Sequence, residues 1–347
     1  MKTRSVKDMQ GAVSPEAASK TAENRELKSE LAQARRALGD IGLVMAEVKS
    51  AIKAVPPVKM SLVPSAIMTG DKPRVTLVVH VTDWHIGLVV PKDMVEGFNE
   101  FNWQIAQDRV AKLRSSVLKY VEVQRHGYVI DEVVFICTGD YVSGDIHEGL
   151  IRTNEFQTPV QAVKAGRLLA WLIQSFAAVF SRVRVEFVAP GNHDRLTRKP
   201  QAQAGGENSW GYVVGCLTQE ILSAQTNVLF KLHTAMQAII NVDGRRYLAG
   251  HGDGIIGTWG IPFYGIERKK MREATARMNM PEERHFHRII IGHFHTGLDH
   301  LDWLIGGALS GTDENDHKEG RHARGHQTTF MVHQDHGEFG FTRWFLD

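Results

Sequence analysis

Four short apolar runs in this chain, rich in β-branched residues, each lead to a cluster of aspartate, asparagine or histidine. Runs of this length predict strands that are buried on both faces, as in the parallel sheet of a layered α/β protein. Because the carboxyl ends of such strands meet at one edge of the sheet, where ligands bind, we expect the polar clusters to converge there. The runs are Val75–Val81, Glu132–Cys137, Val183–Val188 and Ile289–Ile291, and they lead to Asp83, Asp140, Asn192 and His293.

Helical patterns alternate with these runs along the 347 residues. Apolar residues recur at helical spacing in Trp103–Val123, and Thr158-Pro159 is a helix start that leads toward Phe180. Asp243-Gly244 between two apolar segments predicts a β-hairpin, and further β-rich segments follow toward the end of the chain. We therefore expect one α/β domain over residues 74–347.

The N-terminal part of the chain has a different pattern. We expect a flexible tail over residues 1–20, a helical arm over 21–56 and a Pro-rich linker over 57–73. In the arm, apolar residues from Leu27 to Ile52 alternate in steps of four and three, which is a heptad seam. Two interpretations stay open: an amphipathic helix that packs on the main domain, or a short coiled coil that joins subunits into a homo-oligomer.

Overall composition sets few limits on the partner. Lys and Arg number 41 against 39 Asp and Glu, so the net charge is +2 and any affinity for nucleic acid has to come from local clusters of charge. No stretch is long and apolar enough to span a bilayer, and the N-terminus lacks the apolar core of a secretory signal, so we expect no membrane contact and a cytoplasmic protein. Cys137 and Cys216 lie in apolar runs, which predicts small buried side chains in a reducing compartment.

The polar clusters have the composition of a metal site. Each one alone is weak evidence, since Gly-Asp is usually a turn and Asp-x-His occurs by chance. Five clusters together at predicted strand ends favour a centre built from carboxylate and imidazole ligands. They read DWH at 83–85, GD at 139–140, GNHD at 191–194, GHGD at 250–253 and GHFH at 292–295.

In this order, the five clusters resemble the motif series of the calcineurin-like metallophosphoesterase superfamily over about residues 75–297. The resemblance implies a four-layer αββα sandwich, here with the N-terminal helical arm attached. It also implies a catalytic pair in which His193 faces the phosphate and Asp194 orients either His193 or the strand-end turn. The implied metal ligands are Asp83, His85, Asp140 and His295 for one ion, and Asp140, Asn192, His251 and His293 for the other, with Asp140 as the bridging carboxylate.

Phosphoester hydrolysis explains why these residue types are needed. A phosphoester is anionic and repels hydroxide, so the enzyme needs localised positive charge and a nucleophile that forms at neutral pH. Two divalent cations about 3.5–4 Å apart supply both, by generating a bridging hydroxide and by holding the phosphoryl oxygens. Imidazole and carboxylate ligands without thiolate suit Mn, with Fe, Zn, Ni or Co as alternatives, and disfavour Mg and Ca.

The chain departs from the protein-phosphatase branch of this superfamily after Gly139-Asp140. The form G-D-x-x-D-R-G is absent, and with it an arginine that grips phosphate in that branch. The departure counts against a phosphoserine or phosphothreonine phosphatase. We interpret Asp145 and His147, which stand in this loop, as residues that only shape it.

Basic residues near the clusters favour nucleic acid as the substrate. A basic rim around two metal ions suits phosphodiester cleavage in a polyanion. For the basic residues at 268–277, a solvated helix face whose charge is balanced by Glu267 and Glu273 is an equally good explanation. The segments GIER at 265–268 and GALSGTDE at 307–314 look like phage- and prophage-encoded members, themselves similar to the DNA-repair exonuclease branch; such an origin implies the host cytoplasm. The basic residues are Arg195, Arg198, Lys199, Arg268, Lys269, Lys270, Arg272 and Arg277.

Two alternative functions stay open. One is a phosphomonoesterase or small-nucleotide phosphodiesterase, which would use the same metal centre on a smaller substrate. The other is a non-catalytic scaffold that keeps the metal fold and oligomerises through residues 27–52. Retention of a complete ligand set argues against the scaffold.

Overall fold

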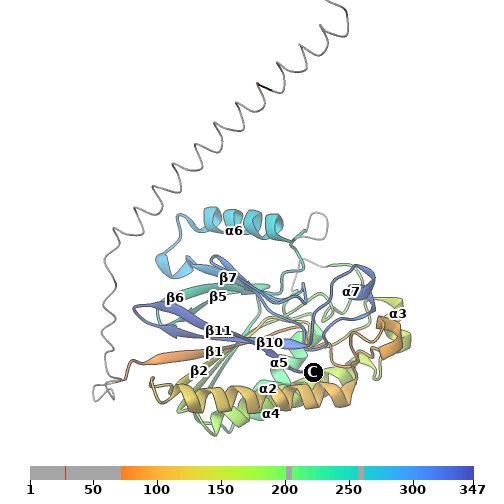
Figure 1. Cartoon of the computed structure of the whole chain (residues 1–347), viewed down its shortest axis with the longest axis horizontal. Coiled ribbons are helices and arrows are strands. Elements are labelled where there is room, and N and C mark those ends of the chain that lie inside the picture. The colour runs from red at the N-terminus through yellow and green to blue at the C-terminus, as the bar shows by residue number, and fades with distance from the viewer. Residues whose placement is uncertain (1–27, 29–71, 201–204, 257–261) are drawn as a thin grey trace, which may run out of the picture. The chain divides into compact units, whose positions relative to one another are not determined.

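Two stacked β-sheets form the centre of the domain, with helices on both outer faces (Figure 1). The computed structural model describes Lys28 and residues 72–200, 205–256 and 262–347. The predicted tail, the predicted arm except Lys28, and nearly all of the predicted linker therefore lie outside the described residues. Within them, the six-stranded sheet has the order β11-β10-β1-β2-β3-β4 and the five-stranded sheet the order β5-β6-β7-β9-β8.

Strands β1 to β4 run parallel, and β10 pairs antiparallel with β1 at one side. In the second sheet β6, β7 and β9 are parallel, so the carboxyl ends of the central strands in both sheets can carry ligands. The strands of the first sheet are β1 (Val75–Val81), β2 (Glu132–Cys137), β3 (Arg182–Val188), β4 (Val228–His233), β10 (His326–His333) and β11 (Gly337–Phe345). Those of the second are β5 (Gln237–Val242), β6 (Arg245–Gly250), β7 (Arg288–Ile291), β8 (Leu298–His300) and β9 (Trp303–Ile305).

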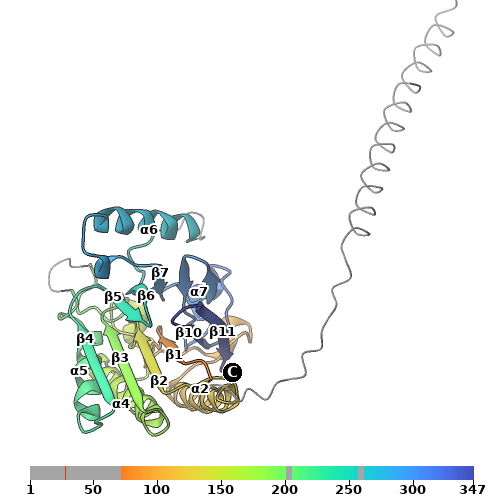
Figure 2. The same ribbon diagram turned by 90° about the vertical axis from the view of Figure 1, so that its left-hand side faces the viewer.

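The helices complete a four-layer sandwich (Figures 1 and 2). Three long helices, α2 (Trp103–Gln124), α4 (Thr158–Ala177) and α5 (Trp210–Leu222), cover the first sheet, and α6 (Phe263–Arg277) covers the second. Short helices lie in the connections: η1 (Lys92–Val95), α3 (Glu148–Thr153), η2 (Glu282–Arg284) and α7 (Glu314–Lys318). No helix in the described ranges combines the length and the apolar composition that a bilayer crossing requires.

Alternation along the strands produces three separate apolar cores between the four layers. In β1, Val79 and Val81 pack toward the helices, whereas Val78 packs toward the second sheet. Ile266 of α6 packs with Ile289 and its neighbours on the outer face of that sheet. Burial on both faces is why the strands read as continuous apolar runs rather than as alternating patterns.

The strand predictions for β1 and β2 are confirmed to the residue, and the hairpin at Asp243-Gly244 joins β5 to β6 as predicted. Both turn residues have positive φ, the backbone shape that a two-residue hairpin needs. The burial predicted for Cys216 is wrong: Cys137 is buried, but Cys216 is exposed. It lies on α5, where an apolar stretch also covers the solvent side of the helix.

Candidate metal centre

The loops that follow the central strands are joined to one another by backbone hydrogen bonds. The N–H groups of Asp83 and His85 donate to the carbonyls of Gly139 and Asp140, both at 3.0 Å. The N–H of Gly292 donates to the carbonyl of His251 at 2.8 Å, which joins the two ligand loops of the second sheet. The predicted convergence of strand ends is therefore built by main-chain contacts.

The candidate ligands also adopt a strained backbone. Seven non-glycine residues in the described ranges have positive φ, and five of them are predicted metal ligands. Such conformations cost on the order of 1–3 kcal/mol each and cluster at functional sites. The five ligands are Asp83, His85, Asp140, His293 and His295, with φ between 47° and 71°.

Glycines in the motifs allow the loops to approach closely. A Cβ on Gly191 would lie 2.0 Å from Oδ1 of Asp140, and one on Gly292 would lie 2.2 Å from Oδ2 of Asp83. Both positions leave no room for a side chain beside a candidate ligand. Gly191 before Asn192 and Gly292 before His293 are thus required by packing.

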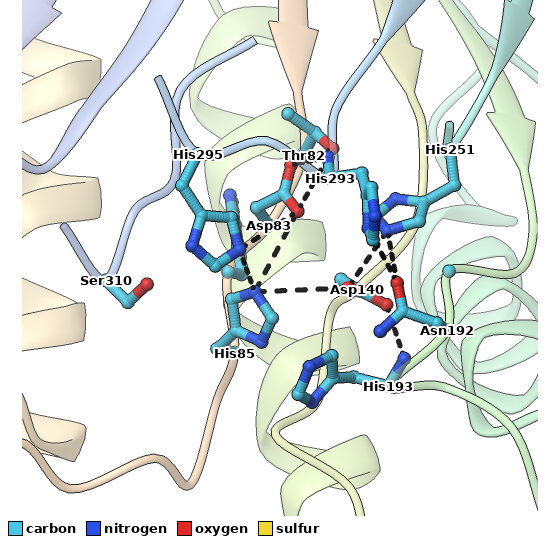
Figure 3. Close-up of polar contacts among 12 residues, drawn as sticks. Thr82, Asp83, His85, Asp140, Asn192, His193, His251, His293, His295 and Ser310 are labelled. Carbon is cyan, nitrogen blue, oxygen red and sulfur yellow. Dashed lines mark hydrogen bonds and ion pairs between the residues drawn. The ribbon is translucent and has the colours of Figure 1, made fainter. Parts of the chain in front are cut away.

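One group of candidate ligands consists of Asp83, His85 and His295 (Figure 3). Their ligand atoms all lie within 4.8 Å of one another. Nε2 of His85 is 3.1 Å from Nε2 of His295, and Oδ1 of Asp83 is 3.8 Å and 3.6 Å from these two nitrogens. The strand end of β1 and the loop after β7 thus bring three ligands to one point.

A second group consists of Asp140, His251 and His293, with Asn192 between the two imidazoles (Figure 3). Oδ1 of Asn192 lies 3.1 Å from Nε2 of His251 and 2.9 Å from Nδ1 of His293. Oδ2 of Asp140 lies 3.0 Å from Nε2 of His251 and 4.0 Å from Nε2 of His85. Asp140 therefore faces both groups, the position that a carboxylate shared by two ions needs.

The carboxylates give this cluster a field that attracts cations. Burial lowers the pKa of His251, but the carboxylates of Asp140 and Asp83 overcome this and raise it to about 10. Burial likewise lowers the pKa of His295, and the carboxylates of Asp316 and Asp83 raise it to about 10. For His293 burial dominates and, with the charge of His251, lowers the pKa to about 3. The same field that holds protons on two of these rings favours metal ions in their place.

Hydrogen bonds behind the rings aim their nitrogen atoms into the cluster. Nδ1 of His251 donates to the carbonyl of Thr138 at 2.8 Å, and Nδ1 of His295 donates to Oδ2 of Asp316 at 2.7 Å. When these rings are neutral, each therefore presents the lone pair of Nε2 to the candidate ligands around it. The donor set and its orientation fit two divalent ions with nitrogen and oxygen ligands.

His193 and Asp194, predicted as a catalytic pair, make different contacts. Nδ1 of His193 donates to the carbonyl of Ser143 at 2.8 Å, and its ring lies 4.7 Å from that of His85, measured between centroids. Asp194 is fully buried, and its carboxylate accepts from four backbone N–H groups, those of Asp140, Tyr141, Val142 and Gly191. Of the two partners predicted for Asp194, it contacts the strand-end turn, while Ser143 orients the His193 ring.

A cleft of about 900 Å³ opens over the cluster. Asp140, Asn192 and His193 lie at its base, apolar residues such as Leu88 and Leu150 line its walls, and Lys318 adds a positive charge. None of the eight basic residues predicted to form a rim lines this cleft in the described ranges, although the positive charge of Arg195 acts on His147, which does line it. Helix α6 carries five of them on the outer layer, where Lys270 pairs with Asp302 and Arg277 with Glu273.

Two residues near the cleft were missed by the sequence reasoning. His147, interpreted as a loop-shaping residue, lines the cleft, and its ring is 5.8 Å from that of His193. Asp316, on α7, holds His295 and itself accepts from Nε of Arg321 at 3.1 Å. His147 could be found only by its nearness to the GD cluster, and Asp316 follows no apolar strand, so no pattern marks it.

One comparison with known proteins identifies the family of this chain. No curated protein matches the chain. Among solved structures, a hypothetical protein from Pyrococcus horikoshii OT3 shares 13% identity over 78% of this chain and 89% of its own, with a TM-score of 0.39. A protein of unknown function from Aquifex aeolicus shares 14% identity over 65% and 83%, with a TM-score of 0.25. The sequence profile of the calcineurin-like phosphoesterases matches residues 76–328, a stretch that contains every predicted site residue. This chain therefore belongs to the calcineurin-like phosphoesterase family, and it is a metal-dependent phosphoesterase.

Proposed function

We propose that this phosphoesterase hydrolyses phosphodiester bonds in nucleic acid. The observation that carries the proposal is the pair of ligand groups around Asp140 at the base of a cleft far larger than a phosphate group. Apolar walls at Leu88, Leu150 and Phe294 suit the sugar and base that flank a phosphodiester. The cleft wall at Ile255 also adjoins α6, since Gly265 in its first turn lies against Ile255 and Ile256. A nucleic-acid strand that leaves the cleft on this side would pass the exposed Tyr264 and the basic residues of α6.

In this proposal two bound divalent ions would supply concentrated positive charge for the phosphoryl oxygens and make water nucleophilic at neutral pH; Mn is preferred, with Fe, Zn, Ni or Co as alternatives. Asp83, His85, Asp140 and His295 would hold one ion, and Asp140, Asn192, His251 and His293 the other. The phosphorus–oxygen bond to the leaving group breaks as the water oxygen bonds to phosphorus.

His193 is the catalytic group that the chain itself offers beside the metal ligands. Its bond to the Ser143 carbonyl fixes Nδ1 as a donor, so Nε2 is the ring atom left to face a substrate. In the imidazolium form, with both ring nitrogens protonated, Nε2–H can donate to a phosphoryl oxygen or give its proton to the leaving oxygen from its place in the cleft. Asp194 acts as a positioning residue, because it touches the backbone of the Asp140 loop and no part of the His193 ring.

A second candidate is a phosphomonoesterase or small-nucleotide phosphodiesterase. It is favoured by the mixed charge of the cleft, where Asp313 and Glu314 stand beside Lys318 and Arg321. A polymer would gain little from counterion release at such a surface.

A substrate panel separates these functions. The purified protein is incubated with Mn and, in parallel, with labelled single- and double-stranded DNA, a dinucleotide, a nitrophenyl phosphodiester and the matching monoester; Asp140→Asn serves as the control for contaminating activity. We expect cleavage of DNA and of the diesters, lost in the variant. If DNA survives while the monoester is turned over, the nucleic-acid proposal fails; if no ester is hydrolysed with metal bound, the scaffold alternative is favoured.

A further inference from the structure

An exposed aromatic pair lies beside the cleft. The ring of Phe98 stacks on that of His322 with centroids 4.3 Å apart and an interplanar angle of 27°, and His317 lies 5.8 Å from Phe98. Phe98 is 59% exposed and belongs to no apolar core of the described domain. An exposed aromatic ring offers a flat apolar face on which a nucleobase can stack.

The position of Phe98 is fixed by its neighbour Asn99. Nδ2 of Asn99 donates to the carbonyls of Ser310 and Thr312 at 2.7 Å and 2.8 Å, and its Oδ1 accepts from Arg109. The same 309–312 loop is attached to the metal centre, since Leu309 N–H donates to the carbonyl of Asp83 at 2.9 Å. The backbone next to Phe98 is therefore tied to the loop that contacts the candidate ligand Asp83.

The other half of the pair is joined to the wall of the cleft. Lys318 and Arg321 line the cleft, and His322 follows Arg321 directly in the chain. Arg321 is held by Asp316, whereas Lys318 is exposed on α7. A cation on the cleft wall next to an exposed ring is the combination with which proteins bind a phosphate and stack its base.

We propose that Phe98 and His322 form a nucleobase-stacking subsite for the nucleotide that flanks the scissile phosphate. The base lies on the exposed face of Phe98, whose other face is covered by His322. This inference rests on the proposed function, because it names the part of a nucleotide substrate that the cleft recognises. The base comes from either a nucleic-acid strand or a small nucleotide diester, since both offer the same aromatic face.

The test compares substrates with and without the base. KM is measured for an oligonucleotide and for the same oligonucleotide with abasic residues, using the wild type, Phe98→Ala, Phe98→Trp and the control Met94→Ala, an exposed apolar residue on the same segment. We expect Phe98→Ala to raise KM for the normal strand about 5- to 150-fold, the range for loss of one stacked base, with KM for the abasic strand unchanged. Phe98→Trp should restore binding, and Met94→Ala should leave KM unchanged.

A binding measurement without turnover supports the same comparison. An oligonucleotide carrying 2-aminopurine should lose fluorescence on binding to the wild type and to Phe98→Trp, but not to Phe98→Ala. If Phe98→Ala abolishes the fluorescence change equally for a dinucleotide and for a longer strand, the stacked base belongs to a small nucleotide substrate. If it does so for the longer strand alone, the stacked base belongs to a nucleic-acid polymer.

Two results would overturn the subsite. One is identical KM values for Phe98→Ala and wild type on the normal strand. The other is an equal rise in KM on the normal and abasic strands, which would indicate a general structural effect. Failure of the proposed function looks different: the wild type would then turn over a phosphomonoester but neither bind nor cleave any nucleotide substrate, and the subsite would fall with it.

Discussion

His193 and Asp140 are neighbours, since the backbone N–H of His193 donates to Oδ1 of Asp140 at 2.8 Å. Substitution of the two side chains is nevertheless expected to have different effects on activity and metal content. His193→Ala should lower kcat about 10²- to 10⁴-fold, the usual contribution of a general acid or base, while the protein keeps its metal. Asp140→Asn should lose both activity and metal, because Asp140 faces both ligand groups. Metal content by mass spectrometry, measured beside kcat, checks the distinction; loss of metal in His193→Ala would contradict it.

The pKa shifts of His251 and His295 predict a pH-dependent metal affinity. Both pKa values are raised from 6.5 to about 10, so the metal-free protein carries protons on these rings at pH 7 that a metal ion has to displace. Metal uptake should release protons, and affinity should rise with pH by about tenfold per unit for each displaced proton. Without metal, the imidazolium–carboxylate pairs stabilise the fold fully below pH 6.5, and this is lost as the pH rises through about 10. Calorimetry in buffers of different ionisation enthalpy checks the release; uptake without protons would refute it.

Asp194 is expected to contribute to the stability of the fold rather than to take part directly in the reaction. Its carboxylate is the acceptor of four buried backbone N–H groups, so Asp194→Ala leaves those donors without a partner. We expect a loss of about 4 kcal/mol or more in the free energy of unfolding, because each of the four unsatisfied buried donors costs about 1–3 kcal/mol. Denaturant unfolding of the variant measures this loss. An unchanged midpoint with abolished activity would instead make Asp194 a direct participant in the reaction.

At the scale of elements, the short helix α7 determines how one ligand is oriented. Asp316 accepts from Nδ1 of His295 at 2.7 Å, so Asp316→Asn should weaken metal binding about 10- to 100-fold, as is usual when the group behind a ligating histidine is changed. Excess Mn should restore kcat. Glu314→Gln is the matched control, since Glu314 lies on the same helix and lines the cleft. Equal metal titration curves for the two variants would contradict the role of Asp316.

The elements differ in how well sequence patterns predicted them. β1 and β2 are buried on both faces, so their apolar runs end where the strands end. Helix α6 buries only Gly265 and Ile266, and its basic residues gave no indication of the layer to which it belongs. A helix with so few buried residues leaves its position to the loops and the sheet that it covers. This is why the sequence did not place the basic residues of α6, whereas it did place the strand ends.

For the molecule as a whole, the N-terminal seam makes a separate prediction. If residues 27–52 form a coiled coil, deletion of residues 1–56 should lower the number of subunits per particle, measured as the mass in solution scattering divided by the mass of the shortened chain. If the seam instead packs on its own chain, the mass should fall only by that of the deleted residues. Turnover of the nitrophenyl phosphodiester should persist in both cases, because every candidate ligand lies between Asp83 and His295.

The sequence by itself determined the ends of the ligand-bearing strands, the residue types at those ends and hence a centre with carboxylate and imidazole ligands. These properties are local: an apolar run sets a buried strand, and the residues after it lie at the edge of the sheet. Only the tertiary structure decided that Asp194 contacts the Asp140 loop, that Asp316 holds His295 and that α6 lies on the outer layer. The physical reason is that these contacts join segments whose approach depends on how four layers pack, and no local pattern in the chain encodes that distance.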